Sequence, residues 1–147
     1  MHLSSFLRGD ALLADMRARD KEEALAELAE AAATTGLDKN AVLAVLQERE
    51  TLGSTAVGDG YAIPHGKIPG LPGMLLIFGR SIAGIDFAAP DGKICHFFFM
   101  VLAPEGAAGQ HLGLLGSIAR LTKDATFTAR LMQARDKAEL TSFLSGA

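Results

Sequence analysis

The chain has 147 residues, of which 49% are hydrophobic, and a formal net charge of -3. This size predicts a single domain, residues 1–147, with a real hydrophobic core. The acidic balance and the lack of a basic patch exclude a general nucleic-acid binder. The longest apolar run, residues 97–103, is too short to span a bilayer, so no membrane insertion is expected. No signal peptide is visible and Cys95 is the one cysteine, which together predict a soluble cytoplasmic protein.

The N-terminal third carries one strand signal and two helix signals. Residues 11–16 are mostly apolar and predict a first strand. Asp20 and Glu23 have the spacing of a capping box, and the apolar residues after them recur at helical spacing as far as Gly36. Asp38 is then placed to cap a second helix.

Arg49 occupies an unexpected position in that second helix. It follows Val45 by four residues and Leu46 by three, so it continues the apolar stripe that faces the core. An arginine here either points inward toward a site or lies at the helix end and extends its charge outward. The periodicity alone does not choose between these two interpretations.

The strands of the second half are marked by apolar runs between turn signals. Residues 75–78 read as a buried strand. Residues 82–87 contain Gly84 and predict a turn followed by a short strand, and residues 90–92 form a turn signal. Residues 94–102 are the most apolar segment, so we expect them to form the central strand.

Helical signals return near the C-terminus. A loop of small residues, 104–109, precedes a third helix that opens at residues 110–111. Asp124 and Asp136 begin two further helices, the second with a capping box. The order of strands and helices predicts an α/β fold, with a mixed β-sheet flanked by helices on both faces.

The most unusual stretch runs from Leu52 to Lys67. It holds four glycines, the two aliphatic hydroxyl side chains of Ser54 and Thr55, and a proline directly before His65. Glycines allow positive φ, and successive backbone N–H groups in such a loop form an anion-binding concavity. Gly66 is expected to leave open space beside the imidazole ring. The candidate binding residues of this stretch are Ser54, Thr55, Gly66 and Lys67.

The histidines differ in what their positions allow. His65 can be presented with fixed geometry, although a lone loop histidine is more often bonded to a neighbouring carbonyl. His111 lies at a helix N-terminus, where the helix dipole favours the neutral ring. Its competing interpretation is a capping or buried polar residue. His96 lies inside the apolar strand and is interpreted as structural, and His2 lies at the chain terminus.

Three of these placements fit one site. Arg49 supplies a planar charged group suited to phosphoryl oxygens, His111 supplies a second imidazole, and His65 would be the nucleophile that carries a phosphoryl group. A zinc site is disfavoured because no H-E-x-x-H or C-x-x-C spacing occurs, and there is no Walker motif for a nucleotide. We therefore expect no metal and no cofactor.

Two segments together resemble a known family. Residues 49–55, RETLGST, and residues 62–67, AIPHGK, are similar to the signature of the type 2 EIIA domains of the bacterial phosphoenolpyruvate-dependent phosphotransferase system. This is the fructose/mannitol-specific and nitrogen-regulatory class. The resemblance extends over nearly the whole chain, including residues 79–81, 84–87 and 102–105.

The resemblance implies a function and partners. It implies that His65 takes its phosphoryl group from the phosphohistidine of an HPr-like carrier, and that Arg49 and His111 stabilise this group. Residues 79–87 look more like the nitrogen-regulatory branch, whose members change cytoplasmic partners with phosphorylation. The alternative is the EIIA of a fructose/mannitol-type transporter that passes the group to an EIIB domain. A binding module that has lost transfer would not need all three residues.

Overall fold

The central strand of the sheet is β5, Cys95–Ala103, as its continuous apolar sequence predicts. The computed structural model describes residues 2–147. In it β4, Leu75–Ile85, pairs antiparallel with β5, while β2, Tyr61–Ala62, and β3, His65–Lys67, pair parallel with successive parts of it. The short β1, Ala56–Gly58, pairs antiparallel with β2. The prediction of a mixed sheet is therefore confirmed.

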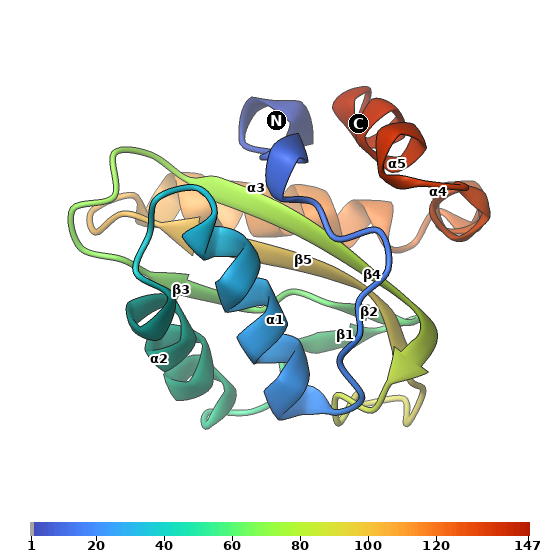
Figure 1. Cartoon of the computed structure of the whole chain (residues 1–147), viewed down its shortest axis with the longest axis horizontal. Helices are drawn as coiled ribbons and strands as arrows, with labels where there is room; N and C mark the ends of the chain where they lie inside the picture. Colours follow the sequence, from blue (N-terminus) through green and yellow to red (C-terminus); the bar gives the residue numbers. More distant parts are fainter. Residues whose placement is uncertain (1) are drawn as a thin grey trace.

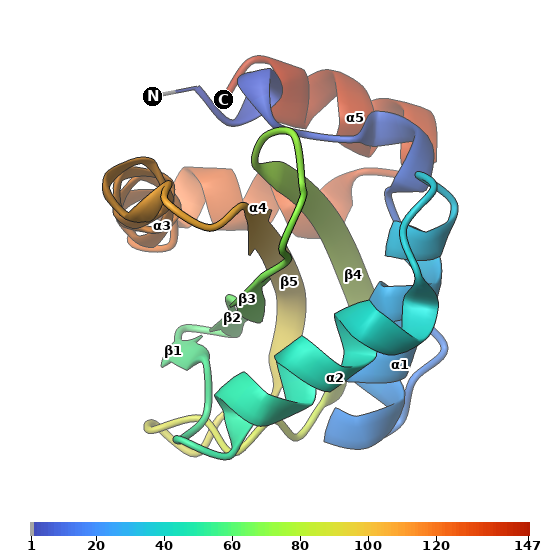
Figure 2. The ribbon, with the colours of Figure 1, turned by 90° about the vertical axis from the view of Figure 1, so that its left-hand side faces the viewer.

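Helices cover both faces of this sheet (Figures 1 and 2). On one side lie α1, Lys21–Ala33, and α2, Lys39–Glu50. On the other lie α3, Ala108–Leu121, α4, Ala125–Gln133, and α5, Lys137–Ser145. Among residues 2–147, no helix combines the length and the apolar character needed to cross a membrane.

The alternation of side chains along β5 creates two cores. Phe98 and Met100 pack with residues of α1 and α2, whereas Phe97 and Phe99 pack with residues of α3, α4 and α5. Burial on both faces explains why the strand has no polar alternation in sequence. The two ends of the chain meet beside α5, where the Leu3 N–H donates to the Ala147 carbonyl at 3.1 Å (Figure 1).

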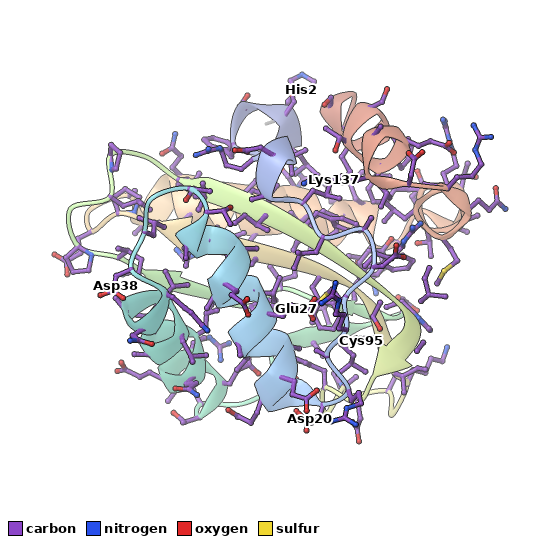
Figure 3. All side chains as sticks on the ribbon, viewed as in Figure 1. His2, Asp20, Glu27, Asp38, Cys95 and Lys137 are labelled. Atoms are coloured by element: carbon purple, nitrogen blue, oxygen red, sulfur yellow. The ribbon has the colours of Figure 1, made fainter. Side chains whose placement is uncertain are left out.

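The predicted helix starts are confirmed by side-chain caps. Asp20 accepts the Glu23 N–H at 2.8 Å, and Asp38 accepts the Asn40 N–H at 2.9 Å. Both caps are labelled at the beginnings of α1 and α2 in Figure 3. Asp124 and Asp136 cap α4 and α5 in the same way. Each cap satisfies a backbone donor that the first helical turn leaves unpaired.

The predicted first strand at residues 11–16 is wrong. This part of the chain forms a short 3-10 turn, Gly9–Ala11, and then one isolated parallel bridge between Leu13 and Gly79 of β4. Met16 also donates its N–H to the Arg80 carbonyl at 2.8 Å. The segment thus lies along the edge of β4 without enough regular pairing to make a strand.

The predicted turn near Gly84 is also wrong, because β4 continues through it to Ile85. The register shifts between Arg80 and Ile85, and Gly84 has a φ of 85°. A Cβ there would lie 2.3 Å from Cδ1 of Ile94. Gly84 therefore marks a bulge within one strand, not a turn between two.

Candidate functional site

Three elements bring Arg49, His65 and His111 together. Arg49 comes from the last turn of α2, His65 begins β3, and His111 lies in the first turn of α3, on the opposite face of the sheet from α2. The imidazole rings of His65 and His111 have centroids 5.4 Å apart and meet edge to face at 79°. Residues from distant parts of the chain thus form one cluster of two imidazoles and a guanidinium.

The hydrogen bonds of His65 define its tautomer. Nδ1 lies 2.7 Å from the Ile63 carbonyl oxygen, and because a carbonyl can only accept, Nδ1 carries the proton. Nε2 therefore holds the lone pair. The Nε–H of Arg49 donates to this nitrogen at 3.3 Å. The ring is held in place with its unprotonated nitrogen beside a fixed positive charge.

Arg49 is half-buried and points inward, which settles the choice left open by periodicity. Its Nη1 also donates to the Gly53 carbonyl at 3.0 Å. A guanidinium has five N–H donors, so these two bonds leave donor capacity for an anion next to His65. Gly53 has a φ of 130°, a conformation that favours glycine at the turn that presents this carbonyl.

His111 is buried, with 8% of its surface exposed. The third helix begins at Ala108, two residues earlier than predicted. The backbone N–H of His111 therefore donates to the Ala107 carbonyl at 2.8 Å. Within residues 2–147, its Nε2 is a buried side-chain atom without a hydrogen-bond partner. Such a group costs free energy in a folded protein, and it is typical of a site that receives a ligand.

Both imidazoles are held neutral near pH 7. Burial lowers the pKa of His65, and the Arg49 charge lowers it further, while the Ile63 carbonyl and the Glu50 charge oppose this shift. Burial also lowers the pKa of His111, with smaller contributions from His65 and from the charge of Lys67. Lys67 is exposed at the end of β3, so its cation is near the cluster without being buried in it.

Gly66 allows α2 to pack against β3. A Cβ at this position would lie 2.9 Å from Cγ2 of Val45, which is closer than carbon atoms tolerate, and 3.1 Å from its Cβ. The prediction of open space beside the His65 ring is therefore wrong on this side, because Val45 fills it. The missing side chain instead lets the helix that carries Arg49 approach the strand that carries His65.

The hydroxyls of Ser54 and Thr55 bond to the protein itself. Ser54 Oγ donates to the Phe87 carbonyl and accepts the Ala56 N–H at 3.0 Å. Thr55 is buried, and its hydroxyl donates to the carboxylate of Glu50. These bonds fix the segment between α2 and β1.

The glycine-rich stretch does not form one continuous concavity. Gly58 and Gly60 make the turn between β1 and β2, where the Gly60 carbonyl accepts the His96 N–H at 2.8 Å. This turn lies at the end of β5 opposite to the part that pairs with His65. The anion-binding loop predicted over residues 52–67 is thus divided, and only its two flanking segments reach the histidine pair.

Sequence reasoning gave no role to two apolar residues that flank the site. Leu52 is 82% exposed in the turn after Arg49, and Leu112 is 72% exposed directly after His111. Leu112 falls outside the apolar face that buries Leu114, and this mismatch was the available signal. Exposed leucines beside a polar cluster are typical of a protein-docking surface.

The family model for the phosphoenolpyruvate-dependent sugar phosphotransferase system, EIIA 2, matches residues 5–147. The chain belongs to this family. It is 42% identical over 146 residues to the nitrogen regulatory protein of Bradyrhizobium diazoefficiens, covering 99% of this chain and 95% of that one. A fructose-specific EIIA component of Haloferax volcanii is 35% identical, with 80% and 77% of the chains covered.

A solved structure of a nitrogen regulatory protein has the same fold as this chain. The crystal structure of nitrogen regulatory protein IIA-Ntr from Neisseria meningitidis superposes with a TM-score of 0.89 at 31% identity. The match covers 97% of this chain and 98% of that one. The predicted family, its nitrogen-regulatory branch and the mixed α/β fold are therefore confirmed.

Proposed function

We propose that this EIIA protein accepts a phosphoryl group on Nε2 of His65 from a phosphohistidine of an HPr-like carrier and acts as a regulatory component of a nitrogen-type phosphotransferase system. The observation that carries the proposal is the arrangement at one nitrogen. The lone pair of Nε2 faces the Arg49 guanidinium, and the buried Nε2 of His111 is close by.

The transfer step needs only two protein partners. The Nε2 lone pair attacks phosphorus, and the bond between phosphorus and the donor imidazole nitrogen breaks, leaving its electron pair on the donor ring. The Nδ1 proton of His65 stays on the ring, where the Ile63 carbonyl stabilises the positive charge that phosphorylation brings. No side chain has to remove a proton before attack, because Nε2 is already unprotonated.

Arg49 and His111 would stabilise the phosphoryl oxygens. In phosphoryl transfer, catalysis depends mostly on positioning and on charge stabilisation. The Arg49 guanidinium donates a hydrogen bond to Nε2 of His65, and it can donate instead to the phosphoryl oxygens when the donor's phosphoryl group approaches. Nε2 of His111 has no hydrogen-bond partner among residues 2–147. With the proton on Nε2, this atom would donate a hydrogen bond to a phosphoryl oxygen. Lys67 would add an exposed positive charge at the rim.

The residues around the cluster would serve the docking of the donor. Ser54, Thr55 and Gly66 hold the loop and the helix in place through the contacts described above. Leu52 and Leu112 supply exposed apolar surface beside the reactive ring, where a partner protein must approach within bonding distance.

The similarity to the nitrogen regulatory protein of Bradyrhizobium diazoefficiens, over nearly the full length of both chains, favours the regulatory role. The similarity to the fructose-specific EIIA component of Haloferax volcanii supports a second candidate, transfer of the group to an EIIB domain. The two roles share the phosphorylation of His65 and differ in the fate of the phosphoryl group afterwards.

The experiment uses the purified protein with its host's HPr-like carrier, phosphorylated with labelled phosphate. We expect label on the protein in an acid-labile, base-stable bond, and no onward transfer to the host's purified EIIB domains. Pull-downs with both phosphorylation states should then retain different partners. Stoichiometric transfer to an EIIB domain would establish the transport role instead, and failure to take up label would refute both.

A further inference from the structure

Glu50 follows Arg49 at the end of α2, and its side chain is only 6% exposed. Its Oε1 accepts the backbone N–H of Thr55 at 3.2 Å and lies 2.8 Å from Nζ of Lys21. Its Oε2 accepts the Thr55 hydroxyl. A buried carboxylate is costly unless it is paired and hydrogen-bonded, and this one meets both conditions.

One chain of hydrogen bonds leads from Glu50 to the reactive ring. Thr55, which Glu50 holds through both its N–H and its hydroxyl, accepts the Ile63 N–H on its own carbonyl at 2.9 Å. The Ile63 carbonyl then accepts Nδ1–H of His65 at 2.7 Å. The carboxylate therefore fixes the backbone that selects the tautomer of His65.

A second chain leads from the same residue to the guanidinium. The backbone carbonyl of Glu50 accepts the Gly53 N–H at 3.1 Å, and the Gly53 carbonyl accepts Nη1 of Arg49 at 3.0 Å. The contact between Glu50 and Thr55 closes this turn at its base. Both groups that meet at the site, the imidazole and the guanidinium, are thus held from one point.

We propose that Glu50 is a positioning residue for phosphoryl transfer, which holds the His65 ring through Thr55 and the Arg49 guanidinium through the turn to Gly53 that its contact with Thr55 closes. This inference rests on the proposed function. Lys21 balances the buried charge and ties the cluster to α1, where its ammonium also lies 5.0 Å from the centroid of the Phe87 ring.

The chemistry of the cluster requires a carboxylate. Three donors converge on Glu50, namely the Thr55 N–H, the Thr55 O–H and the Lys21 ammonium, and two acceptor oxygens receive them. A glutamine has one acceptor oxygen and a donor amide in nearly the same volume. Glu50→Gln therefore disturbs the hydrogen bonds while changing the packing little.

The test compares Glu50→Gln with Glu48→Gln, which makes the same charge change at an exposed position of α2. Single-turnover phosphorylation is measured at saturating phosphorylated carrier. We expect Glu50→Gln to slow transfer on the order of tenfold or more, as a small misplacement of reacting groups does, with carrier affinity unchanged. Glu48→Gln should transfer at the wild-type rate.

A second readout reports the geometry without any phosphoryl transfer. In nitrogen NMR of histidine-labelled protein, His65 should be protonated on Nδ1 in the wild type and in Glu48→Gln, and should show a mixture of tautomers in Glu50→Gln. A folded Glu50→Gln variant with the wild-type rate and a single tautomer would overturn the proposal. A wild-type protein that takes no label would refute the proposed function, while the NMR comparison would still judge the role of Glu50.

Thr55→Val covers the case in which Glu50→Gln does not fold. It keeps the shape of the side chain and the pair between Glu50 and Lys21, and it removes only the hydroxyl donor. We expect a smaller loss of rate with the same change in the His65 tautomer signal. Wild-type rate and tautomer in a folded Thr55→Val variant would count against the proposal.

Discussion

His65 and His96 lie toward opposite ends of the same sheet, and their rings are fixed in similar ways. Nδ1 of His65 bonds to the Ile63 carbonyl at 2.7 Å, and Nδ1 of His96 lies 2.9 Å from the Ser81 carbonyl. Both rings are half-buried. A fixed tautomer therefore does not by itself set His65, the proposed acceptor, apart from His96.

The surroundings of the two rings differ. Nε2 of His65 accepts a hydrogen bond from the Arg49 guanidinium. The centroid of the His111 imidazole lies 5.4 Å from the centroid of the His65 ring. His96 borders an open hollow of about 790 Å³, whose lining includes Lys93 and Lys123. Lys123 there pairs with Asp59 at 3.0 Å. In the proposed function, His65 would be reactive because Arg49 and His111 converge on its ring, and this convergence needs the helices on both faces of the sheet.

The largest expected effect comes from exchanging the two histidines for alanine. His65→Ala should reduce label uptake from the phosphorylated carrier to background, because the accepting nitrogen is gone. His96→Ala should keep the wild-type extent of labelling. Equal uptake by His65→Ala and the wild type would show that His65 is not the reactive ring.

Arg49→Lys should be next in size. Lysine keeps the charge but loses the planar group that contacts Nε2 and the Gly53 carbonyl together. We expect transfer to slow on the order of 100-fold, the size seen when one preorganised donor is lost. The rate is measured from the label taken up in reactions quenched at successive times, and circular dichroism checks that the fold is kept. A rate within about twofold of the wild type would remove the guanidinium from the mechanism.

His111→Ala should have a smaller effect. It removes one hydrogen bond to a charged oxygen, worth about 1.5 kcal/mol, and so slows transfer by roughly tenfold. The phosphorylated form should also lose its label faster. Because the Nε2 of His111 lacks a partner among residues 2–147, the unphosphorylated variant should not lose stability through that atom. Unchanged rates of both gain and loss of label would exclude His111 from the site.

The smallest expected effect is a shift in titration. Burial and the Arg49 charge lower the pKa of His65, so its ring should protonate with a midpoint below about 6.5, its ordinary value. Protonation removes the lone pair of Nε2. Transfer should therefore persist as the pH falls below about 6.5, and should decline only when the pH falls through the lowered pKa of His65. NMR titration of the His65 ring gives the midpoint, and Arg49→Gln should move it upward. A midpoint at or above the ordinary value would contradict the electrostatic argument.

Local patterns in the sequence predicted those parts that depend on short-range geometry. The caps at Asp20 and Asp38 and the inward face of α2 arise from spacings of a few residues within one or two helical turns. The backbone geometry over such distances is known in advance. The family signature then pointed to His65.

The rest depended on how distant segments pack. The occupant of the space at Gly66 is Val45, which is decided by the docking of α2 on β3. The direction of the turn at Gly58 and Gly60 is decided by pairing with β5. The sequence assigned no role to Glu50, and only the fold buries its carboxylate against Lys21.

The most direct test of the central claim is to identify the phosphorylated atom. Phosphorus and nitrogen NMR of the histidine-labelled protein, phosphorylated by its carrier, should show one phosphoryl group bonded to Nε2 of His65, with the proton still on Nδ1. Phosphorylation at Nδ1 of His65, at His96 or at His111 would contradict the proposed chemistry.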